Sequence, residues 1–284
     1  MTLSNRKILR TLLCLLAGTL YAVCLSACGA KEPLSENRDA EIESPVIAND
    51  LSNQKVTAIA EDTQGHIWIG TFRGLNKNNV HDYHQYFCTD DSLGLPDNQI
   101  THLLRDSKNR FWVGTVNGVC LYTDKDNFRI IPIEADNKNV RQILEDRNGR
   151  IFLNTGFQLY AYHPREEKIT CVLPEISPGN AFYAQCHIAP DNNLWVMTST
   201  GLRCYDPSTL QLKESVALSG YPYYSYLHNN ELWITGNHTL SIFDTRTRSF
   251  KPLPQPIARN TTLCNADIDY IHPCLLYTSP SPRD

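Results

Sequence analysis

Three residues of the chain have the types and order of a metal site. His81, His84 and Cys88 form the string His-x-x-His-x-x-x-Cys, and all three side chains are common zinc ligands. On a β-strand, residues three apart point to opposite faces, so His81 and His84 do not converge. His84 and Cys88 share a face but lie about 13 Å apart at roughly 3.3 Å per residue. The sequence therefore predicts no metal site here.

A pair of neighbouring carboxylates, Glu61-Asp62, has the types needed for acid–base chemistry. An aspartate before a turn recurs further along the chain, however, as Asp106, Asp146 and Asp191. A carboxylate in that place accepts hydrogen bonds from backbone N–H groups of the turn. We therefore interpret these residues as turn residues rather than catalytic ones.

The motifs of common enzymes are missing from the sequence. It contains no phosphate-binding loop G-x-x-x-x-G-K-[ST], no nucleophile elbow G-x-S-x-G and no H-E-x-x-H zinc motif. We predict no catalytic residue and no cofactor, and we do not expect the chain to be an enzyme.

The strongest pattern is an internal repeat of about 40 residues. Residues 56–75 and 100–119 align closely, and three more divergent copies follow. The spacing between successive aromatic anchors is 44, 40, 43 and 38 residues. The anchors are Trp68, Trp112, Phe152, Trp195 and Trp233.

Each copy predicts four short strands separated by turns rich in Asp, Asn and Gly. The fourth strand is looser, as in residues 82–87 or 249–253. Helical repeats of this period would need amphipathic spacing over ten or more residues, and none is found. We therefore predict an all-β protein, an incomplete β-propeller with about five four-stranded blades. The large rings are expected to pack between blades, and an open ring would expose apolar blade faces and favour aggregation.

Residues 1–27 are predicted to be an export signal. Arg6, Lys7 and Arg10 precede an apolar run that ends in Leu25-Ser-Ala-Cys28-Gly, which is similar to a bacterial lipobox. Cys28 is then the expected lipidation site. An ordinary signal peptide with an incidental cysteine, or an uncleaved anchor helix, remains the alternative.

The predicted organisation continues with a linker over 28–50 and blades over 51–273, where a sixth blade starts after Asn265. Residues 274–284 (CLLYTSPSPRD) resemble the translation of a sequencing adapter and are left out of the fold prediction. A genuine Pro/Ser-rich tail is the alternative.

Charge and cysteine content limit the partners. The formal net charge is −4, and no Lys/Arg cluster occurs after the leader, so nucleic acid is not an expected partner. An even number of cysteines outside the leader and tail permits disulfides, but their wide spacing allows buried free thiols equally well. They are Cys88, Cys120, Cys171, Cys186, Cys204 and Cys264.

The motif I-x-x-I-x-x-D-x-x-G-x-[IL]-W-[IV]-G-T-x-x-G-L, preceded by Leu51-Ser-Asn53 or Gly94-Leu-Pro-Asp-Asn98, resembles the two-component regulator propeller repeat. The resemblance covers about residues 51 to 273. It implies the N-terminal sensor region of a Bacteroides-type hybrid two-component system (hybrid sensor histidine kinase/response regulator), exported to the periplasm or membrane-anchored in a Gram-negative bacterium.

The resemblance also implies partners. They are an oligosaccharide ligand, the remaining blades, a second propeller, and a downstream kinase that would control glycan-utilisation genes. A dimer at full length and membrane attachment through lipid or a later helix are expected too. Two departures from the family, the lipobox-like leader and the presence of only about five blades, keep two rivals open: a free-standing surface lipoprotein propeller, and a propeller polysaccharide lyase or glycosidase.

Candidate ligand-binding residues follow from the blade geometry. If the first strand of each motif is innermost, the Thr-x-x-Gly turn lies on the same rim as the links between blades. Amides and aromatic rings on that rim suit sugars. Strand packing for the tyrosines and a solvated turn for Arg73 are the alternatives, and the ligand could also bind where two propellers meet. The predicted residues are Arg73, Asn117, Gln158, Asp97, Asn98, Tyr221, Tyr223, Tyr224 and His238, and the rim also holds Phe72, Asn139, Tyr183 and Thr200.

Overall fold

The computed structural model describes residues 45–79, 81–89, 94–123, 125–174 and 184–260, together with Ile268 and Ile271. The chain divides into two compact units, Met1–Ile42 and Glu43–Asp284, and all described residues lie in the second. Several predictions fall outside these residues: the leader, Cys28, Tyr183, Cys264, the start of a sixth blade after Asn265, and the tail 274–284.

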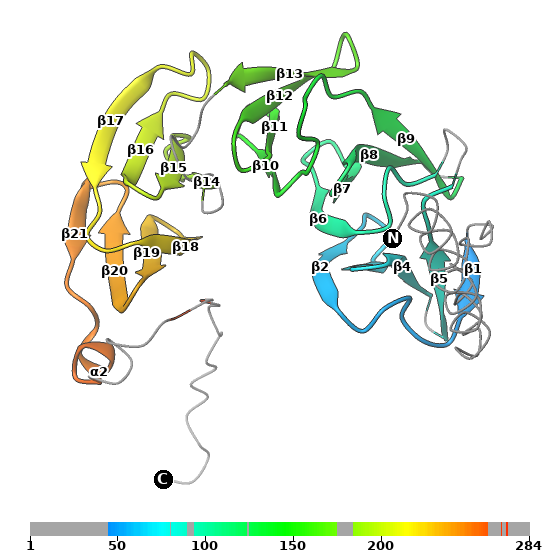
Figure 1. Ribbon diagram of the computed structural model, residues 1–284, viewed down its shortest axis with the longest axis horizontal. Helices are drawn as coiled ribbons and strands as arrows, with labels where there is room; N and C mark the ends of the chain where they lie inside the picture. Colours follow the sequence, from blue (N-terminus) through cyan, green and yellow to red (C-terminus); the bar gives the residue numbers. More distant parts are fainter. Residues whose placement is uncertain are drawn as a thin grey trace, which may run out of the picture. The chain divides into compact units, whose positions relative to one another are not determined.

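The first two copies of the repeat form two antiparallel sheets, each running from its first strand to its last in sequence order (Figure 1). The first sheet contains β2 (Val56–Glu61), β3 (Ile67–Thr71), β4 (Gly74–Asn79) and β5 (Asp82–Tyr86), and the second contains β6 (Ile100–Arg105), β7 (Phe111–Thr115), β8 (Gly118–Thr123) and β9 (Asn127–Ile131).

The next three copies repeat the arrangement, which confirms the all-β prediction of four-stranded blades. Blade 3 contains β10 (Gln142–Glu145), β11 (Ile151–Asn154), β12 (Leu159–His163) and β13 (Lys168–Leu173). Blade 4 contains β14 (Gln185–Ile188), β15 (Leu194–Thr198), β16 (Gly201–Tyr205) and β17 (Leu212–Ala217). Blade 5 contains β18 (Pro222–His228), β19 (Glu231–Gly236), β20 (Thr239–Asp244) and β21 (Ser249–Lys251).

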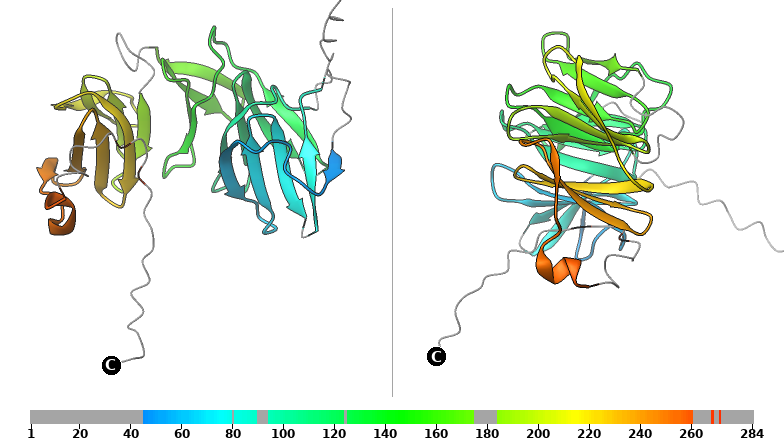
Figure 2. Two further views of the ribbon diagram at one scale, coloured as in Figure 1. Left: turned by 60° about the horizontal axis from the view of Figure 1, so that its bottom comes forward. Right: turned by 90° about the vertical axis from the view of Figure 1, so that its left-hand side faces the viewer.

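The first strand of each copy is the innermost one, which is the condition on which the predicted rim depends. β2 contacts β6, β6 contacts β10, β10 contacts β14, and β14 contacts β18. The other strands of each sheet follow outward in order, and each sheet is twisted (Figure 2). The turn after the second strand and the link to the next blade therefore share one rim, and the aspartate turn lies on the other.

The aspartate turn is stabilised by one carboxylate that accepts several hydrogen bonds. In blade 2, Oδ1 of Asp106 accepts the backbone N–H groups of Lys108 (3.0 Å) and Arg110 (2.8 Å), and Oδ2 accepts the indole N–H of Trp112 (2.8 Å). Asp62 binds the turn of blade 1 and the indole of Trp68 in the same way. Asp146 binds its turn in blade 3, which confirms the turn prediction for these three residues.

The prediction is wrong for the position of Asp191, the fourth aspartate, within its repeat. Ala189, not Asp191, occupies the equivalent position, because the Ala189 N–H donates to the Asn193 carbonyl as the Asp106 N–H donates to that of Arg110. Asp191 lies two residues further on, is exposed, and accepts the backbone N–H of Asn193 (3.0 Å). The fourth copy therefore has no carboxylate at this position.

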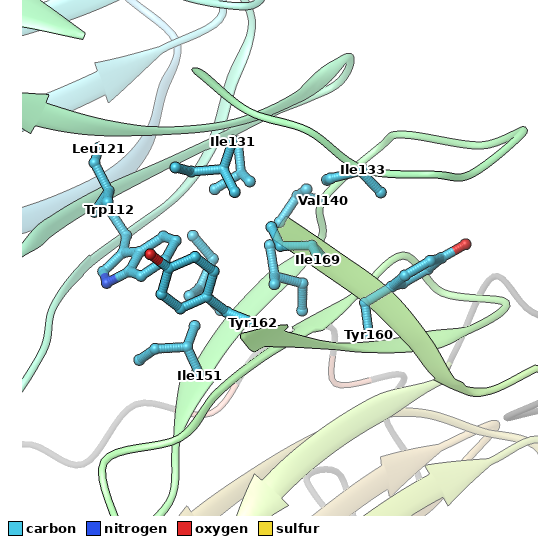
Figure 3. Packing of buried hydrophobic residues seen from close by; sticks show 12 residues of the cluster. Trp112, Leu121, Ile131, Ile133, Val140, Ile151, Tyr160, Tyr162 and Ile169 are labelled. Atoms are coloured by element: carbon cyan, nitrogen blue, oxygen red, sulfur yellow. The ribbon is translucent and has the colours of Figure 1, made fainter. Parts of the chain in front are cut away.

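One apolar cluster fills each interface between consecutive blades, as the sequence predicts for the large rings. Trp68, Trp112 and Trp195 are fully buried, and each contacts an aromatic ring of the next blade. Between blades 2 and 3, the Trp112 and Tyr162 rings meet edge to face with centroids 4.9 Å apart (Figure 3). Phe152 fills the same position between blades 3 and 4.

The two terminal blades differ from the internal ones. Ile59 is 66 % exposed on blade 1, whereas Ile143, its equivalent on blade 3, is 2 % exposed against blade 2. Trp233 of blade 5 is only partly buried, unlike the three other tryptophans. Within the described part of the chain the sheets do not close into a ring.

Two short elements complete the fold. β1 (Val46–Ala48) pairs with β5 as a fifth strand at the outer edge of blade 1, inside the segment 28–50 that the sequence assigns to a linker. Four residues form α2 (Gln255–Ala258) after the last strand. No helix among the described residues is long and apolar enough to cross a membrane.

The cysteines among the described residues are free thiols. Cys120, Cys186 and Cys204 are buried, and Cys88 and Cys171 are exposed. Burial raises the pKa of Cys186 to about 12 and that of Cys204 to about 11, so both are protonated thiols at neutral pH. These three cysteines act as small apolar side chains in the cores between blades.

Candidate functional site

A cavity of about 380 Å³ opens where the innermost strands of consecutive blades begin. This volume is within the range of about 300–1,000 Å³ that is usual for small-molecule sites. The cavity lies on the rim shared by the blade links and the Thr-x-x-Gly turns. We call it the axial pocket, and it is lined by Thr57, Gln99, Ile100, Thr101, Val116, Asn139, Arg141, Gln142, Ala184 and Gln185.

Local irregularities of the inner strands place two threonines in the pocket. The pairing of β2 with β3 shifts between Val56 and Ala58, and that of β6 with β7 shifts between Ile100 and His102. Thr57 and Thr101 are the extra residues at these bulges. A bulge redirects the side chain of the extra residue, which explains how a threonine of an inner strand comes to line the pocket.

The blade links are held by hydrogen bonds of their own. Oδ1 of Asp97 accepts the backbone N–H of Gln99 (2.8 Å), and the carbonyl of Gln99 accepts the N–H of Val116 (3.2 Å). In the next link, Oδ1 of Asn137 accepts the N–H of Asn139 (3.0 Å). Gln99 and Asn139 are therefore positioned by ordered turns rather than by free loops.

Several lining residues also join one blade to the next. Thr101 Oγ1 donates a short hydrogen bond to the carbonyl of Val140. Oε1 of Gln142 accepts the N–H of Cys186 (2.9 Å), and Oε1 of Gln185 accepts the N–H of Ser225 (2.6 Å). The wall of the axial pocket is thus part of the contact between blades 2 and 3, 3 and 4, and 4 and 5.

Among the described residues that line the axial pocket, Arg141 alone carries an ionisable side chain. His102 follows Thr101 on β6, and burial lowers its pKa to about 4, so its imidazole is neutral at physiological pH. The other polar groups of the lining are hydroxyls and amides. The side-chain oxygen of Asn139 is buried and has no hydrogen-bond partner among the described residues.

None of the nine predicted ligand-binding residues is in the lining of the axial pocket. Oδ1 of Asn98 accepts the N–H of Cys88 (2.7 Å), and Asp97 supports Gln99 as described above. Oε1 of Gln158 accepts the hydroxyl of Tyr160 (2.5 Å). Arg73, Asn117 and His238 are exposed on the turns that follow the second strands. These residues lie on the predicted rim but outside the pocket.

The tyrosine-rich segment belongs to blade 5. Tyr221 precedes β18 and is 52 % exposed, whereas Tyr223 and Tyr224 lie within β18 and are partly buried. The hydroxyl of Tyr224 donates to the carbonyl of Ile271 (3.5 Å). Tyr223 is the extra residue of the irregularity between Pro222 and Tyr224, so it is equivalent to Thr57 and Thr101 of the earlier blades.

Of the rim residues that were named from sequence and that the structure describes, only Asn139 lines the pocket. Arg141, Gln142 and Gln185 were not predicted from sequence, because the site was sought in the turns and blade links, and these three residues lie at the starts of inner strands. One signal was present: Arg141-Gln142 puts two consecutive polar residues at the start of a buried strand. A polar pair there leaves one side chain directed away from the core.

The described lining of the axial pocket can bind a ligand. Among the described residues that line it, none is an aspartate, glutamate, histidine, tyrosine, lysine or cysteine, the residue types that act as general acids, bases and nucleophiles. It offers hydrogen-bond donors and acceptors at fixed positions beside the aliphatic surfaces of Ile100, Val116 and Ala184. Such a lining can hold a polar ligand.

A second, smaller cavity of about 140 Å³ lies on the opposite rim, between blades 1 and 2. Its polar groups satisfy one another: Asp126 accepts the hydroxyls of Tyr86 and Tyr122, both at 2.7 Å, and Lys77 donates to the Tyr122 oxygen (3.3 Å). Burial opposes ionisation of Asp126, but these hydrogen bonds outweigh it and lower its pKa. We interpret this network as a polar contact between blades.

Solved structures share the fold at low sequence identity. Virginiamycin B lyase from Staphylococcus aureus has 18 % identity and a TM-score of 0.56, with coverage of 75 % of this chain and 75 % of that one. The extracellular domain of a hybrid two-component system from B. thetaiotaomicron has 15 % identity and a TM-score of 0.45, over 70 % of this chain. This chain spans 36 % of that domain. No curated protein sequence matches the chain.

A family match covers the first two blades. Residues 50–73 and 94–117 match the two component regulator propeller family. The matched segments run from the link before each inner strand to the turn after the second strand, and the second segment includes Gln99, Thr101 and Val116 of the axial pocket. The first two blades therefore match the two-component regulator propeller repeat.

Proposed function

We propose that the chain is the ligand-sensing propeller of an exported hybrid two-component sensor, and that its axial pocket binds an oligosaccharide. The match of residues 50–73 and 94–117 to regulator propeller repeats supports a sensory role. The buried side-chain oxygen of Asn139, which has no partner among the described residues, is the observation that points to a hydroxyl-bearing ligand. A sugar hydroxyl can donate the missing hydrogen bond after a small shift of the side chain.

The pocket wall offers a route from binding to signalling. Thr101, Gln142 and Gln185 line the pocket and also bind the neighbouring blade. A ligand held by this wall would favour one arrangement of the blades over another, which is a population shift between two states. In this proposal, a downstream kinase reads that shift and controls genes for glycan use.

The experiment is a binding screen of the chain against a broad oligosaccharide panel, followed by variants of two asparagines on the same rim. Asn139→Ala removes a residue of the pocket lining, and Asn117→Ala removes an exposed asparagine outside it. We expect Asn139→Ala to weaken binding about tenfold and Asn117→Ala to leave it unchanged. Absence of binding to every oligosaccharide would refute the glycan part of the proposal.

A free-standing surface lipoprotein propeller is the second candidate. The sequence Leu25-Ser-Ala-Cys28 favours it, because an anchor at Cys28 would hold the propeller at a membrane surface without a later helix. Sequencing of the gene beyond the codon for Pro273 distinguishes the two: a kinase domain in the same reading frame supports the sensor, and a stop codon soon after a closing blade supports the lipoprotein.

A further inference from the structure

The register of the inner strands makes residues of different blades directly comparable. In every blade, the aromatic anchor on the second strand pairs with one residue of the inner strand, and this partner marks the same place in each copy. The pairs are Ala60–Trp68, Leu104–Trp112, Leu144–Phe152, His187–Trp195 and Tyr226–Trp233.

The residue three places before this partner, which we call the axial position, faces the axial pocket in blade after blade. The five blades hold Thr57, Thr101, Arg141, Ala184 and Tyr223 at the axial position. The first four of these residues all line the axial pocket. A single position of the repeat therefore supplies one lining residue from each of four consecutive blades.

The residue type at the axial position is not determined by the packing of the blades. Positions with a packing role keep their character from copy to copy, as the aromatic anchor does in all five. The axial position instead holds four residue types in five copies. Its chemistry can therefore follow the ligand, because the blade itself does not require a particular side chain there.

Tyr223 brings the axial position of blade 5 next to the pocket. β14 contacts β18, and Oε1 of the lining residue Gln185 accepts the backbone N–H (2.6 Å) and the hydroxyl (3.0 Å) of Ser225. Ser225 follows Tyr223 by two residues on β18, so their Cα atoms are at most roughly 7 Å apart at about 3.3 Å per residue. Tyr223 is not part of the cavity lining and lies beside it, one blade further round the axis.

The ring of Tyr223 is the part of the side chain that a ligand can reach. Tyr223 is partly exposed, whereas its hydroxyl oxygen is buried. An aromatic ring presents flat apolar faces, which can pack against the apolar face of a sugar. The hydroxyls and amides of the axial pocket would then bind the polar groups of the same ligand.

From these observations we infer that the axial position determines ligand specificity, and that Tyr223 extends the binding site to blade 5 by stacking its ring against one sugar unit. This inference rests on the proposed function, because it adds a specificity-determining residue to the same site.

The test measures binding of the whole chain to maltotriose, cellotriose, xylotriose and chitotriose, and to every member of the oligosaccharide panel that binds. Tyr223→Leu removes the ring but keeps an apolar side chain, and Tyr223→Phe keeps the ring without the hydroxyl. Tyr221→Leu is the control, because Tyr221 is 52 % exposed, precedes β18 and is outside the axial position. Asn139→Ala reports separately on the pocket itself.

We expect Tyr223→Leu to weaken binding about tenfold. Tyr223→Phe and Tyr221→Leu should bind as tightly as the wild type. Saturation-transfer NMR adds a readout that a purely structural role of Tyr223 would not change. The C–H protons on the apolar face of one sugar unit should receive strong saturation in the wild type and in Tyr223→Phe, and should lose it selectively in Tyr223→Leu.

Three results would count against the inference. Unchanged binding by Tyr223→Leu, while Asn139→Ala still weakens binding, would overturn it and leave the proposed function in place. Equal losses for Tyr223→Leu and Tyr223→Phe would overturn the assignment of the contact to the ring. Failure of the wild type to bind any of the four trisaccharides or any member of the panel would contradict both the inference and the proposed function.

Discussion

Ala189 stands where a carboxylate would accept the indole N–H of Trp195. The equivalent tryptophans Trp68 and Trp112 donate to Asp62 (2.9 Å) and Asp106 (2.8 Å). Trp195 is fully buried, and its Nε1 has no hydrogen-bond partner among the described residues. A buried donor without a partner costs about 1–3 kcal/mol, so blade 4 retains the ring that packs against blade 5 but has lost the bond that fixes it.

Ala189→Asp should therefore stabilise the chain. The new carboxylate would accept the Trp195 N–H, and we expect the free energy of unfolding to rise by about 1 kcal/mol after the cost of burying a charge is included. Urea denaturation followed by tryptophan fluorescence measures the change. Ala189→Val is the control, because it fills the position without an acceptor. A decrease in stability for Ala189→Asp would show that blade 4 has adapted to the alanine.

Asp106→Ala should have a large opposite effect. It would leave the backbone N–H groups of Lys108 and Arg110 and the indole N–H of Trp112 without their shared acceptor. We expect a loss of about 2–3 kcal/mol in the free energy of unfolding. Asp191→Ala provides the comparison, since Asp191 is exposed and outside this position; its loss should be about 0.5 kcal/mol or less. Equal effects of the two substitutions would contradict the corrected register.

Acid should destabilise the chain in a narrow range of pH. A hydrogen bond from Lys251, with help from backbone N–H groups, lowers the pKa of Asp244 to about 2, and Lys213 does the same for Asp206. Groups with a lowered folded pKa stabilise the fold above their unfolded pKa of about 3.9 and lose that contribution as pH falls towards the folded value. The melting temperature should therefore drop between about pH 4 and pH 2.

Circular dichroism melts from pH 7 to pH 2 measure this drop. In Asp244→Asn the dependence on pH should be shallower, because one of the carboxylates with a lowered pKa is gone. An identical melting temperature at pH 6 and pH 2 would contradict the assignment of these carboxylates to stabilising interactions.

Equivalent isoleucines should respond differently according to their blade. Ile143 is 2 % exposed in the core between blades 2 and 3, and Ile59 is 66 % exposed on blade 1. Ile143→Ala is expected to cost about 2–5 kcal/mol in the free energy of unfolding, and Ile59→Ala about 0.5 kcal/mol or less. Chemical denaturation of both variants provides the measurement. A large loss for Ile59→Ala would show that a partner covers blade 1 in solution, for example a second copy of the chain.

Most of the fold could be predicted from sequence because every blade repeats the same local signals. Turn aspartates, β-branched strands and one large ring recur with a period near 40 residues, so a weak copy is recognised by its alignment with strong ones. The register error at Asp191 arose where the signal changed: the fourth copy has lost the aspartate, and a different one lies two residues later. β1 was not expected, because three residues after a polar segment carry little periodicity.

The axial pocket was harder to predict because it depends on departures from the repeat. Thr57 and Thr101 enter the pocket through strand irregularities, and a bulge is not visible in a pattern of alternating residues. The axial pocket lies on the predicted rim, but the exposed turn residues Arg73, Asn117 and His238 lie outside the pocket. The distance of each residue from the axis is a tertiary property that local sequence does not record.

Hydrogen–deuterium exchange of the whole chain, with and without an oligosaccharide that binds it, tests the central claim most directly. We predict that the ligand slows exchange at the starts of the inner strands, residues 99–101, 139–142 and 184–185, and leaves the aspartate turns at 62–66, 106–110 and 146–150 unchanged. Slowed exchange confined to the aspartate turns, or to residues 221–224 of blade 5, would contradict the assignment of the axial pocket as the ligand site.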